Sequence, residues 1–364
     1  MERVRVIQWA TGVVGAWSLR MIIDRPELEL VGVWVSSPEK DGKDAGELCG
    51  RPTTGVTATS DKDAILALDA DVVVHCALAV GPHGHLPFDD DVIRLLRSGK
   101  NVISTVSYFS PLMEGPERMA ELEEACRAGN ATLYGGGLDP GFVCDRVVSL
   151  LTGSLADVKR IKMIESIDVS NHPGAELLSE VGFGKRPEEM RLDSPGVEYY
   201  GMRLLPGAVA KLADMFGIAL DGIEPRGDIV LAKEDRHVRM GTLPKGTMIG
   251  ALQEFNGIRD GEPFITHQWV HYVGRDEMPD DWVLAPPHAH GAPPYFVRIE
   301  IEGTPSLTVD MTWTDPQDET SFSLPTAAVA VNAIPDVLAA APGLLREQIF
   351  GAWRPSPSLS DVSV

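Results

Sequence analysis

The chain has few cysteines and a deficit of basic residues, and each shortage excludes a class of protein. Four cysteines, Cys49, Cys76, Cys126 and Cys144, lie far apart and form no C-x-x-C pair. We therefore expect neither a disulfide framework nor a structural zinc site, and we predict no metal. Lys and Arg number 32 against 53 Asp and Glu, a formal net charge of −21. This charge opposes binding to nucleic acid or an anionic membrane, because both require basic residues that neutralise phosphates.

The chain also has no long uninterrupted apolar run. Its most apolar late segment, 326–345, contains Asn332, Pro335, Asp336 and Pro342 and does not have the pattern of a membrane span. Its first residues lead into an apolar strand without a signal-peptide pattern. We therefore expect a cytoplasmic protein without a membrane partner. A length of 364 residues exceeds what one core usually supports, so two domains are expected.

The first part of the chain alternates short β-branched runs with helical segments. Strands are expected at 4–8, 28–35, 71–77, 101–105 and 131–137, and helices at 91–98 and 116–128. A further helix after the first strand is expected to bury Val14, Trp17 and Met21, which are spaced by three and four. The run 71–77 is too apolar to face water, so it belongs in the sheet centre. This alternation predicts a doubly wound α/β, or Rossmann, domain.

The pattern changes near residue 155. Segments 158–170, 263–274 and 295–303 alternate polar and apolar residues, which indicates a mostly antiparallel sheet, with a helix at 207–216 and a surface loop or lid at 276–294. Helical character returns after Leu324 and is expected to pack back on the first domain. The prediction is thus a Rossmann domain of residues 1–154 plus 325–364 and an α+β domain of residues 155–324.

The stretch VIQWATGVVGAW (6–17) lies where a Rossmann domain has its G-x-G-x-x-G turn. Gly12 takes the position that lets the main chain approach a diphosphate, and Gly15 the position that lets helix and strand pack closely. Ala10 replaces the first glycine, which serves only the tight turn, and Trp9 ends the strand, where its ring would cover one side of the site. We predict that this turn binds a dinucleotide at the helix start through Trp9, Ala10, Thr11, Gly12, Val13, Val14 and Gly15. The alternative is a glycine turn without a ligand.

The residues about twenty positions further on predict the cofactor. Many NAD enzymes have a carboxylate there that binds the ribose, whereas this chain has Ser36, Ser37 and Lys40. Hydroxyls and an ammonium suit a ribose 2′-phosphate, so we predict NADP(H) as the preferred cofactor and NAD(H) as a second one. The alternative is a solvated loop, because Glu39 and Asp41 flank the same residues.

Ligands of such sheets bind beyond the carboxyl ends of the strands. Ala77, Leu78 and Thr105 follow two of the predicted strands and are expected to contact the cofactor. In GGGLDPGFVCD (135–145) the glycines permit close approach, and Pro140 is expected to begin a helix with Asp139 as its N-cap. Asp139 is therefore either a capping residue or a carboxylate that faces the nicotinamide and holds a substrate ammonium.

With these motifs the chain resembles the dihydrodipicolinate-reductase-like NAD(P)H oxidoreductases, a group that includes 2,4-diaminopentanoate dehydrogenase and the native amine dehydrogenases. The resemblance covers nearly the full length and depends on VIQWATGVVG, ELVGVWVSSPEKDGKDAGEL, GKNVIST, GGGLDPGF, ESIDVSNHPG, VGFG and VNAIPDV. It implies a second domain for substrate binding and dimerisation, a homodimer, and reversible hydride transfer at a carbon bearing nitrogen. The implied substrate is a hydrophobic amine, or the ketone or aldehyde that reductive amination converts to it.

Two departures from the group bear on the chemistry. Ser107 stands where the amine dehydrogenases have a Glu for proton transfer, and Asp139 stands where the group commonly has Asn. Because a serine is a poor acid or base near neutral pH, other proton donors are needed. The catalytic candidates are Asp139, Ser107, Tyr108, Glu165 and His172, joined by His267 and His271, which share one face of a strand.

Other interpretations remain open on the sequence. Asn332 is expected to bind the cofactor carboxamide or ribose, with a helix-packing amide as the alternative. The departure at Ser107 keeps two further functions in view, namely a regulatory NADP(H)-binding protein and a reductase of a non-amine substrate.

Overall fold

The computed structural model of the chain describes residues 3–77, 89–106, 108–110, 115–172, 175–190, 201, 204–287, 295–313, 323–346 and 349–355. Contacts divide the chain into two compact units, Met1–Phe142 with Phe322–Arg346, and Val143–Ser321 with Glu347–Val364. These bounds differ from those of the predicted domains, because the helical turns after residue 142 pack on a helix of the second unit. The roles of the units in binding cofactor and substrate stay predictions.

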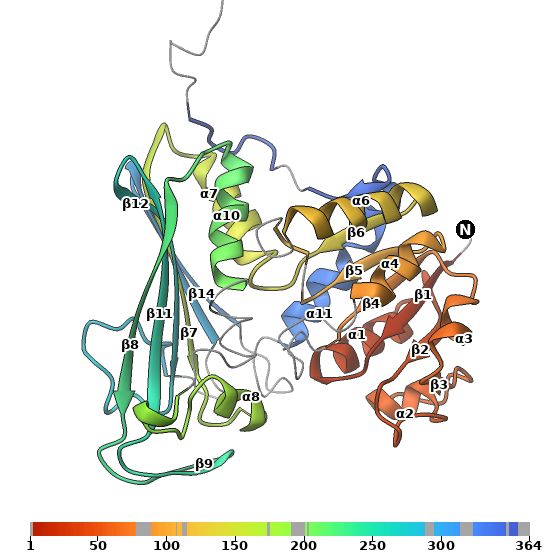
Figure 1. The fold of residues 1–364 in the computed structure, drawn as a ribbon, viewed down its shortest axis with the longest axis horizontal. Coiled ribbons are helices and arrows are strands. Elements are labelled where there is room, and N and C mark those ends of the chain that lie inside the picture. The colour runs from red at the N-terminus through yellow and green to blue at the C-terminus, as the bar shows by residue number, and fades with distance from the viewer. Residues whose placement is uncertain are drawn as a thin grey trace, which may run out of the picture. The chain divides into compact units, whose positions relative to one another are not determined.

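The first unit contains a parallel sheet. Its strands are β1 (Val4–Trp9), β2 (Leu28–Trp34), β3 (Ala58–Thr59), β4 (Val72–His75), β5 (Asn101–Ser104), β6 (Thr132–Gly135) and β15 (Gly343–Leu344). Their order is β15-β6-β5-β4-β1-β2-β3 (Figure 1). Val72, Val73 and Val74 of the central strand have no exposed surface, as the apolar run predicts. The prediction of a doubly wound Rossmann sheet is confirmed.

Helices cover this sheet. They are α1 (Val13–Asp24), α2 (Ala45–Cys49), α3 (Lys62–Leu66), α4 (Asp89–Arg97), α6 (Pro116–Gly129), α11 (Ser323–Asn332) and α12 (Ile334–Ala339). α1 packs on α11, and α4 packs on α6 (Figure 1). The core beneath α1 and α11 includes Val6, Ile22 and Val331. The helices after residue 322 thus belong to the first unit, and β15 adds a parallel strand beside β6.

The buried face of α1 differs from the expected one. The helix buries Gly15, Ser18, Leu19 and Ile22, whereas Val14, Trp17 and Met21 are only partly buried. Val14 and Met21 pack against the edge of the core, so the expected face is only partly correct. The fully buried stripe was missed because it contains a glycine and a serine, which carry no hydrophobic signal. A small residue at Gly15 is what allows the helix to approach the strand.

The second unit is built on a mixed six-stranded sheet of order β14-β13-β7-β12-β11-β8. Its strands are β7 (Asp157–Asp168), β8 (Gly222–Leu231), β11 (Met248–Arg259), β12 (Glu262–Tyr272), β13 (Tyr295–Thr304) and β14 (Leu307–Trp313), and β9 (Arg236–Val238) and β10 (Gly241–Leu243) form a separate hairpin. Neighbouring strands are antiparallel except for the parallel pair β7 and β12. The mostly antiparallel arrangement was expected from the alternating segments.

The helical elements of the second unit are η1 (Val143–Val147), α7 (Val148–Thr152), α8 (Ala175–Glu180), η2 (Pro187–Glu189) and α10 (Leu205–Phe216). α10 lies along one face of the sheet, as Figure 1 shows. α10 approaches the sheet closely at Gly257 of β11, where an added Cβ would lie only 2.7 Å from Val209 Cγ1 of the helix. Lys211 of α10 pairs with the buried carboxylate of Asp145 in η1 at 2.7 Å.

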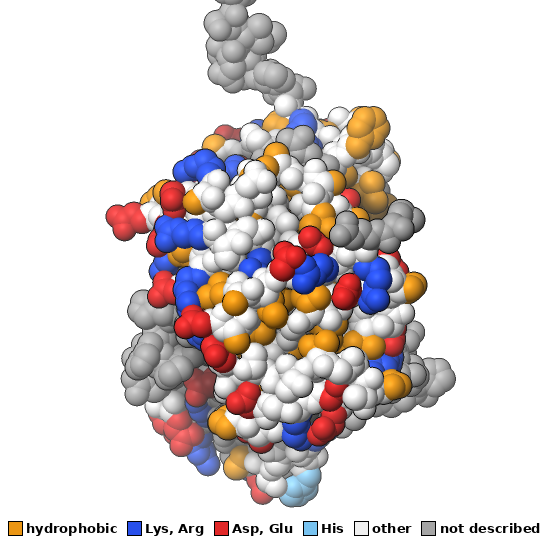
Figure 2. Space-filling model, turned by 90° about the vertical axis from the view of Figure 1, so that its right-hand side faces the viewer, with side chains coloured by type: hydrophobic (Ala, Val, Ile, Leu, Met, Phe, Trp, Pro, Cys, Tyr) orange, Lys and Arg blue, Asp and Glu red, His pale blue; other side chains and the backbone are white. Residues whose placement is uncertain are grey.

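Surface charge is mixed on the face drawn in Figure 2, where Lys and Arg side chains lie beside Asp and Glu. In the first unit, Lys62 pairs with Asp91 and Arg97 with Glu124, each at 2.6 Å. These basic side chains are thus engaged with acids of their own unit. In the described ranges, no helix has both the length and the apolar character needed to cross a membrane.

Candidate cofactor and active site

The turn from β1 to α1 has the geometry that its two glycines predict. A Cβ on Gly15 would lie 2.2 Å from the carbonyl oxygen of Ala10, so helix and turn meet where no side chain fits. A Cβ on Gly12 would meet no described atom within 4 Å, so the main chain is open to an approaching group there. Ala10 has a φ of 68°, in the left-handed region that favours glycine. The alanine therefore adopts the conformation of the glycine it replaces.

The start of α1 is equipped to hold an anion. Gly12 is the N-cap and provides no side-chain cap, and the first intrahelical bond runs from Ala16 N to Gly12 O at 2.8 Å. The amides of Val13 and Val14 therefore lack partners within the helix and lie at the positive end of its dipole. Val13 is also 55% exposed despite its apolar side chain. Open amides beside an apolar surface fit the diphosphate and ribose of a dinucleotide.

Trp9 supports the site from within the unit. Its ring is buried and stacks on Trp34, at the end of β2, with ring centroids 4.5 Å apart and planes inclined by 20°. Trp34 in turn has Lys62 Nζ 5.5 Å from its ring centroid and donates to Ser60 O. The predicted role of Trp9, a ring covering one side of the site, stays untested.

The structure brings Lys40 to the glycine turn. Its Nζ donates to the Thr11 carbonyl at 2.8 Å and lies 3.3 Å from the Thr11 hydroxyl. Ser36 is exposed and Ser37 half-buried in the same loop. The Ser37 hydroxyl beside Glu39 lowers the pKa of that carboxyl, which is therefore ionised at neutral pH. The loop thus presents one ammonium at the turn and one carboxylate beside Ser37.

Ala77 and Thr105 lie at the carboxyl ends of β4 and β5. Thr105 N donates to His75 O at 3.0 Å, which extends the pairing of these strands. His75 Nδ1 lies 3.1 Å from Ser104 Oγ, and burial lowers the pKa of this histidine to about 3. His75 is therefore neutral near pH 7 and supports the strand ends without carrying charge.

Asn332 is not brought to the turn. Asn332 accepts from Arg25 Nη2 at 2.6 Å, at the far end of α1, and that helix of 12 residues is about 18 Å long. Asn332 thus has the partner of a helix-packing amide. Leu78 and Ser107 lie outside the described residues.

Asp139 lies in a tight turn and not at a helix N-terminus. Gly137 N donates to Pro140 O at 2.9 Å, Gly141 has a φ of 125°, and the Asp139–Pro140 peptide is cis. The next helix begins at Val143, so the expected helix start at Pro140 and the N-cap role of Asp139 were wrong. The half-buried carboxylate instead follows the carboxyl end of β6, where open α/β sheets bind ligands.

Tyr108 is buried and bonded within the same unit. Its hydroxyl donates to Asp89 Oδ1 at 2.7 Å, at the first residue of α4. Asp89 also lies 3.7 Å from Arg118 Nε. The Tyr108 hydroxyl is thus anchored by a carboxylate that a guanidinium partly neutralises.

The remaining candidates lie in the second unit. Glu165 of β7 is buried, and its cross-strand neighbours are Trp269 of β12 and Val297 of β13. Because alternate residues of a strand share a face, His267 and His271 lie on the same face as Trp269. The rings of Trp269 and His271 are 5.0 Å apart.

Burial lowers the pKa of two histidines near this face, His271 and His172. Burial, and then the nearby His172, lower the pKa of His271 to about 4. Burial, and then Arg239, lower the pKa of His172. Both imidazoles are therefore mainly neutral near pH 7, and the lowered pKa makes each a weaker proton acceptor than a solvent-exposed histidine.

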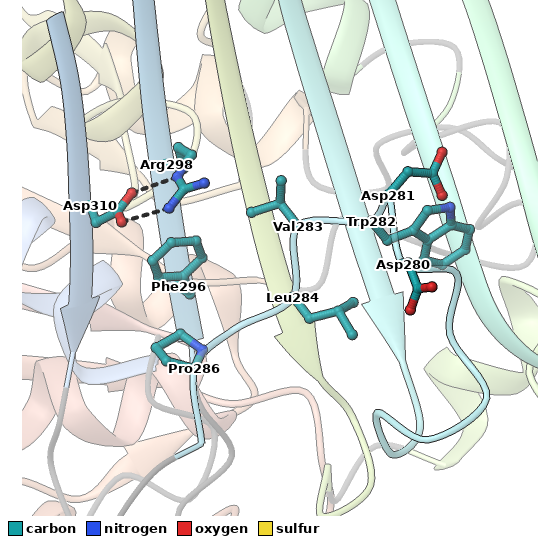
Figure 3. Close-up of a pocket in the computed structure, with 9 residues that line it drawn as sticks. All are labelled: Asp280, Asp281, Trp282, Val283, Leu284, Pro286, Phe296, Arg298 and Asp310. Carbon is teal, nitrogen blue, oxygen red and sulfur yellow. Dashed lines mark hydrogen bonds and ion pairs between the residues drawn. The ribbon is translucent and has the colours of Figure 1, made fainter.

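Figure 3 shows a surface hollow of the second unit, on the face of its sheet opposite to Glu165. It is lined by Asp280, Asp281, Trp282, Val283, Leu284, Pro286, Phe296, Arg298 and Asp310. Arg298 makes two bonds of 2.7 Å to Asp310, so its charge is already satisfied. Val297 lies beside Glu165 and shares its face of the sheet, whereas its neighbours Phe296 and Arg298 point to the other face. The hollow is therefore separate from Glu165.

Sequence reasoning missed two residues that support the turn, Gln8 and Ser18. Both are fully buried and bonded to each other, Ser18 Oγ donating to Gln8 Oε1 at 2.7 Å. The available signal was the polar Gln8 between the apolar Ile7 and Trp9 near the end of a central strand, where a buried amide requires a partner.

Comparisons with known proteins show the family to which the chain belongs. Residues 142–350 match the family described as the 2,4-diaminopentanoate dehydrogenase C-terminal domain. An amine dehydrogenase from Streptomyces virginiae is 31% identical over 359 residues, which cover 94% of each chain. A 2,4-diaminopentanoate dehydrogenase from Acetoanaerobium sticklandii is 23% identical over 362 residues, covering 94% of this chain and 92% of the relative.

The fold also matches solved structures. An amine dehydrogenase from Mycobacterium smegmatis superposes with a TM-score of 0.73 at 20% identity, with 94% of each chain covered. Fold, turn and relatives together define an NAD(P)-dependent oxidoreductase of the Rossmann type. The chain belongs to the family of amine dehydrogenases and 2,4-diaminopentanoate dehydrogenases. The resemblance seen in the sequence motifs is confirmed.

Proposed function

We propose that the protein is an amine dehydrogenase that prefers NADP(H) and interconverts a hydrophobic amine with its ketone or aldehyde and ammonia. The observation that carries this proposal is the open main chain at Gly12, beside unpaired helix amides and the Lys40 ammonium. The family membership supplies the reaction class. A purely regulatory role is not favoured, because both curated relatives are named dehydrogenases.

In this proposal the chain's own groups divide the work of holding the cofactor. The amides of Val13 and Val14 bind the diphosphate, and Lys40 with Ser36 and Ser37 binds the ribose 2′-phosphate. Ala77 and Thr105 lie toward the nicotinamide, which supplies the hydride when bound. The space at Gly12 fits such a ligand because no side chain of the described residues lies within 4 Å of a Cβ placed there.

Proton transfer is assigned among Asp139, Tyr108, Glu165 and His172. We propose that Asp139 holds the substrate ammonium, since its half-buried carboxylate follows the carboxyl end of β6. His172 is the proposed proton acceptor as the amine is oxidised, and burial keeps its imidazole mainly in the neutral, unprotonated form by lowering its pKa. The homodimeric state and the cytoplasmic location stay predictions.

The reaction class is tested by incubating the protein with NADPH and a panel of hydrophobic ketones and aldehydes. We expect NADPH absorbance to fall only when ammonia is also present, because the proposed acceptor is the C=N carbon. The matched control omits ammonia. Turnover without ammonia would instead identify a carbonyl reductase, and no turnover with any carbonyl compound would contradict the enzyme assignment.

The cofactor preference is tested by replacing Lys40 with glutamine. Loss of a charge-assisted bond to the 2′-phosphate is expected to weaken NADPH binding by about 10- to 100-fold and NADH binding by about twofold or less. The matched control is Lys43→Gln, since Lys43 pairs with Glu47 at 2.9 Å and not with the turn. Calorimetric titration measures both affinities. An equal loss for NADPH and NADH would contradict the 2′-phosphate role.

A further inference from the structure

A buried glutamine lies directly beneath the glycine turn. Gln8, in β1, has no exposed surface. Its Oε1 accepts from Ser18 Oγ at 2.7 Å, and its Nε2 donates to Ala10 O at 2.8 Å and to Trp9 O at 3.3 Å. A buried amide costs free energy unless its donors and acceptors are paired, and this one is paired at both ends. Its partners are the turn and the helix that follows the turn.

The residue that Gln8 contacts has an unfavourable conformation. Ala10 has a φ of 68°, which an alanine adopts at a cost that glycine avoids. Both ends of the residue are anchored, because its N–H donates to Trp34 O at 2.9 Å and its carbonyl accepts from Gln8. The missing side chain of Gly15 leaves room for that carbonyl against α1. Hydrogen bonds thus hold a backbone conformation that the alanine does not itself favour.

This arrangement fixes the direction of the following peptide. Because the peptide bond is planar and trans, the N–H of Thr11 points opposite to the Ala10 carbonyl and therefore away from Gln8. We propose that Gln8, held by Ser18, is a positioning residue that sets the conformation of the phosphate-binding turn and so determines cofactor affinity. The inference rests on the proposed function, because cofactor binding is its readout.

The test uses Gln8→Met in the full-length protein, which keeps the length of the side chain and removes its amide. The Kd for NADPH, measured by calorimetric titration, is expected to rise about tenfold, because the turn then spends only part of its time in the binding conformation. In an Ala10→Gly background the rise is expected to be about threefold or less, since glycine adopts a positive φ without support. A merely structural role for Gln8 would not produce this dependence on residue 10.

Two further variants complete the experiment. Gln268→Met is the matched control, because Gln268 is a buried amide that donates to Glu254 in the second unit at 3.0 Å, and its removal is expected to leave the Kd unchanged. Ser18→Ala is the milder variant if Gln8→Met does not fold, with an expected rise of about threefold.

The outcomes separate this inference from the proposed function. An unchanged Kd in Gln8→Met and Ser18→Ala, or an equal rise with alanine and with glycine at position 10, would overturn the positioning role of Gln8. A wild-type protein that binds neither NADPH nor NADH would overturn the proposed function itself.

Discussion

Replacing Gly12 with aspartate is expected to abolish NADP(H) binding while leaving the fold at least as stable as that of the wild type. Gly12 is the N-cap of α1 with φ −68° and ψ −166°, a conformation open to any residue, and an added Cβ would meet no described atom within 4 Å. Aspartate is a better N-cap than glycine by a few tenths of a kcal/mol, so the free energy of unfolding is expected to stay level or rise slightly. Its charge, however, would lie against the cofactor diphosphate. Repulsion of about 4 kcal/mol at 4 Å corresponds to a Kd increase of roughly 1000-fold.

The matched control for this substitution is Gly12→Asn, which has the same shape without the charge. We expect it to weaken binding by about tenfold, through the volume of its side chain alone. Urea unfolding and calorimetric titration of both variants separate stability from affinity. Equal affinity in wild type and Gly12→Asp would place the diphosphate elsewhere, and unfolding of the aspartate variant would contradict the open geometry at Gly12.

Gly15→Ala is expected to disturb both stability and binding, because the added Cβ would lie 2.2 Å from the Ala10 carbonyl oxygen. Both groups belong to the backbone, so the helix start and the turn must move apart. Overpacking of this kind costs about 1–3 kcal/mol of unfolding free energy. The shifted amides are expected to raise the Kd for NADPH by about 100-fold or more.

The control for this prediction is Gly222→Ala at the start of β8, where an added Cβ, unlike that on Gly15, would meet no described atom within 4 Å. It tests the same change of residue in the second unit without the steric contact. We expect its affinity for NADPH to equal that of the wild type. If Gly15→Ala bound NADPH as tightly as Gly222→Ala does, the close contact between helix and turn would not matter for binding.

The sheet of the first unit was predictable because its strands carry strong signals. The run 71–77 is apolar on both faces, and the structure places β4 in the centre of the sheet. Elements as short as β3, with two residues, and α3, with five, lack enough positions to show any periodicity. β8 was missed for another reason, because most of its residues are exposed and its apolar residues do not alternate with polar ones.

Local geometry at the candidate site was less predictable. A proline after an aspartate is typical of a helix start, yet Gly141 and the bond from Gly137 to Pro140 form a turn that delays the helix to Val143. The types of residue at positions 36–40 predicted a phosphate site. That Lys40 contacts Thr11 of the glycine turn could not be predicted from the sequence, because it depends on how the two loops fold together. Asn332 was assigned from its place in a returning helix, which does not reveal at which end of α1 it lies.

The central claim is that the helix start after Gly12 binds the diphosphate of the cofactor. A crystal structure of the protein with bound NADP⁺ tests it most directly. The diphosphate oxygens are predicted to lie about 3 Å from the amide nitrogens of Val13 and Val14. A bound cofactor whose diphosphate lies away from these amides would contradict the account.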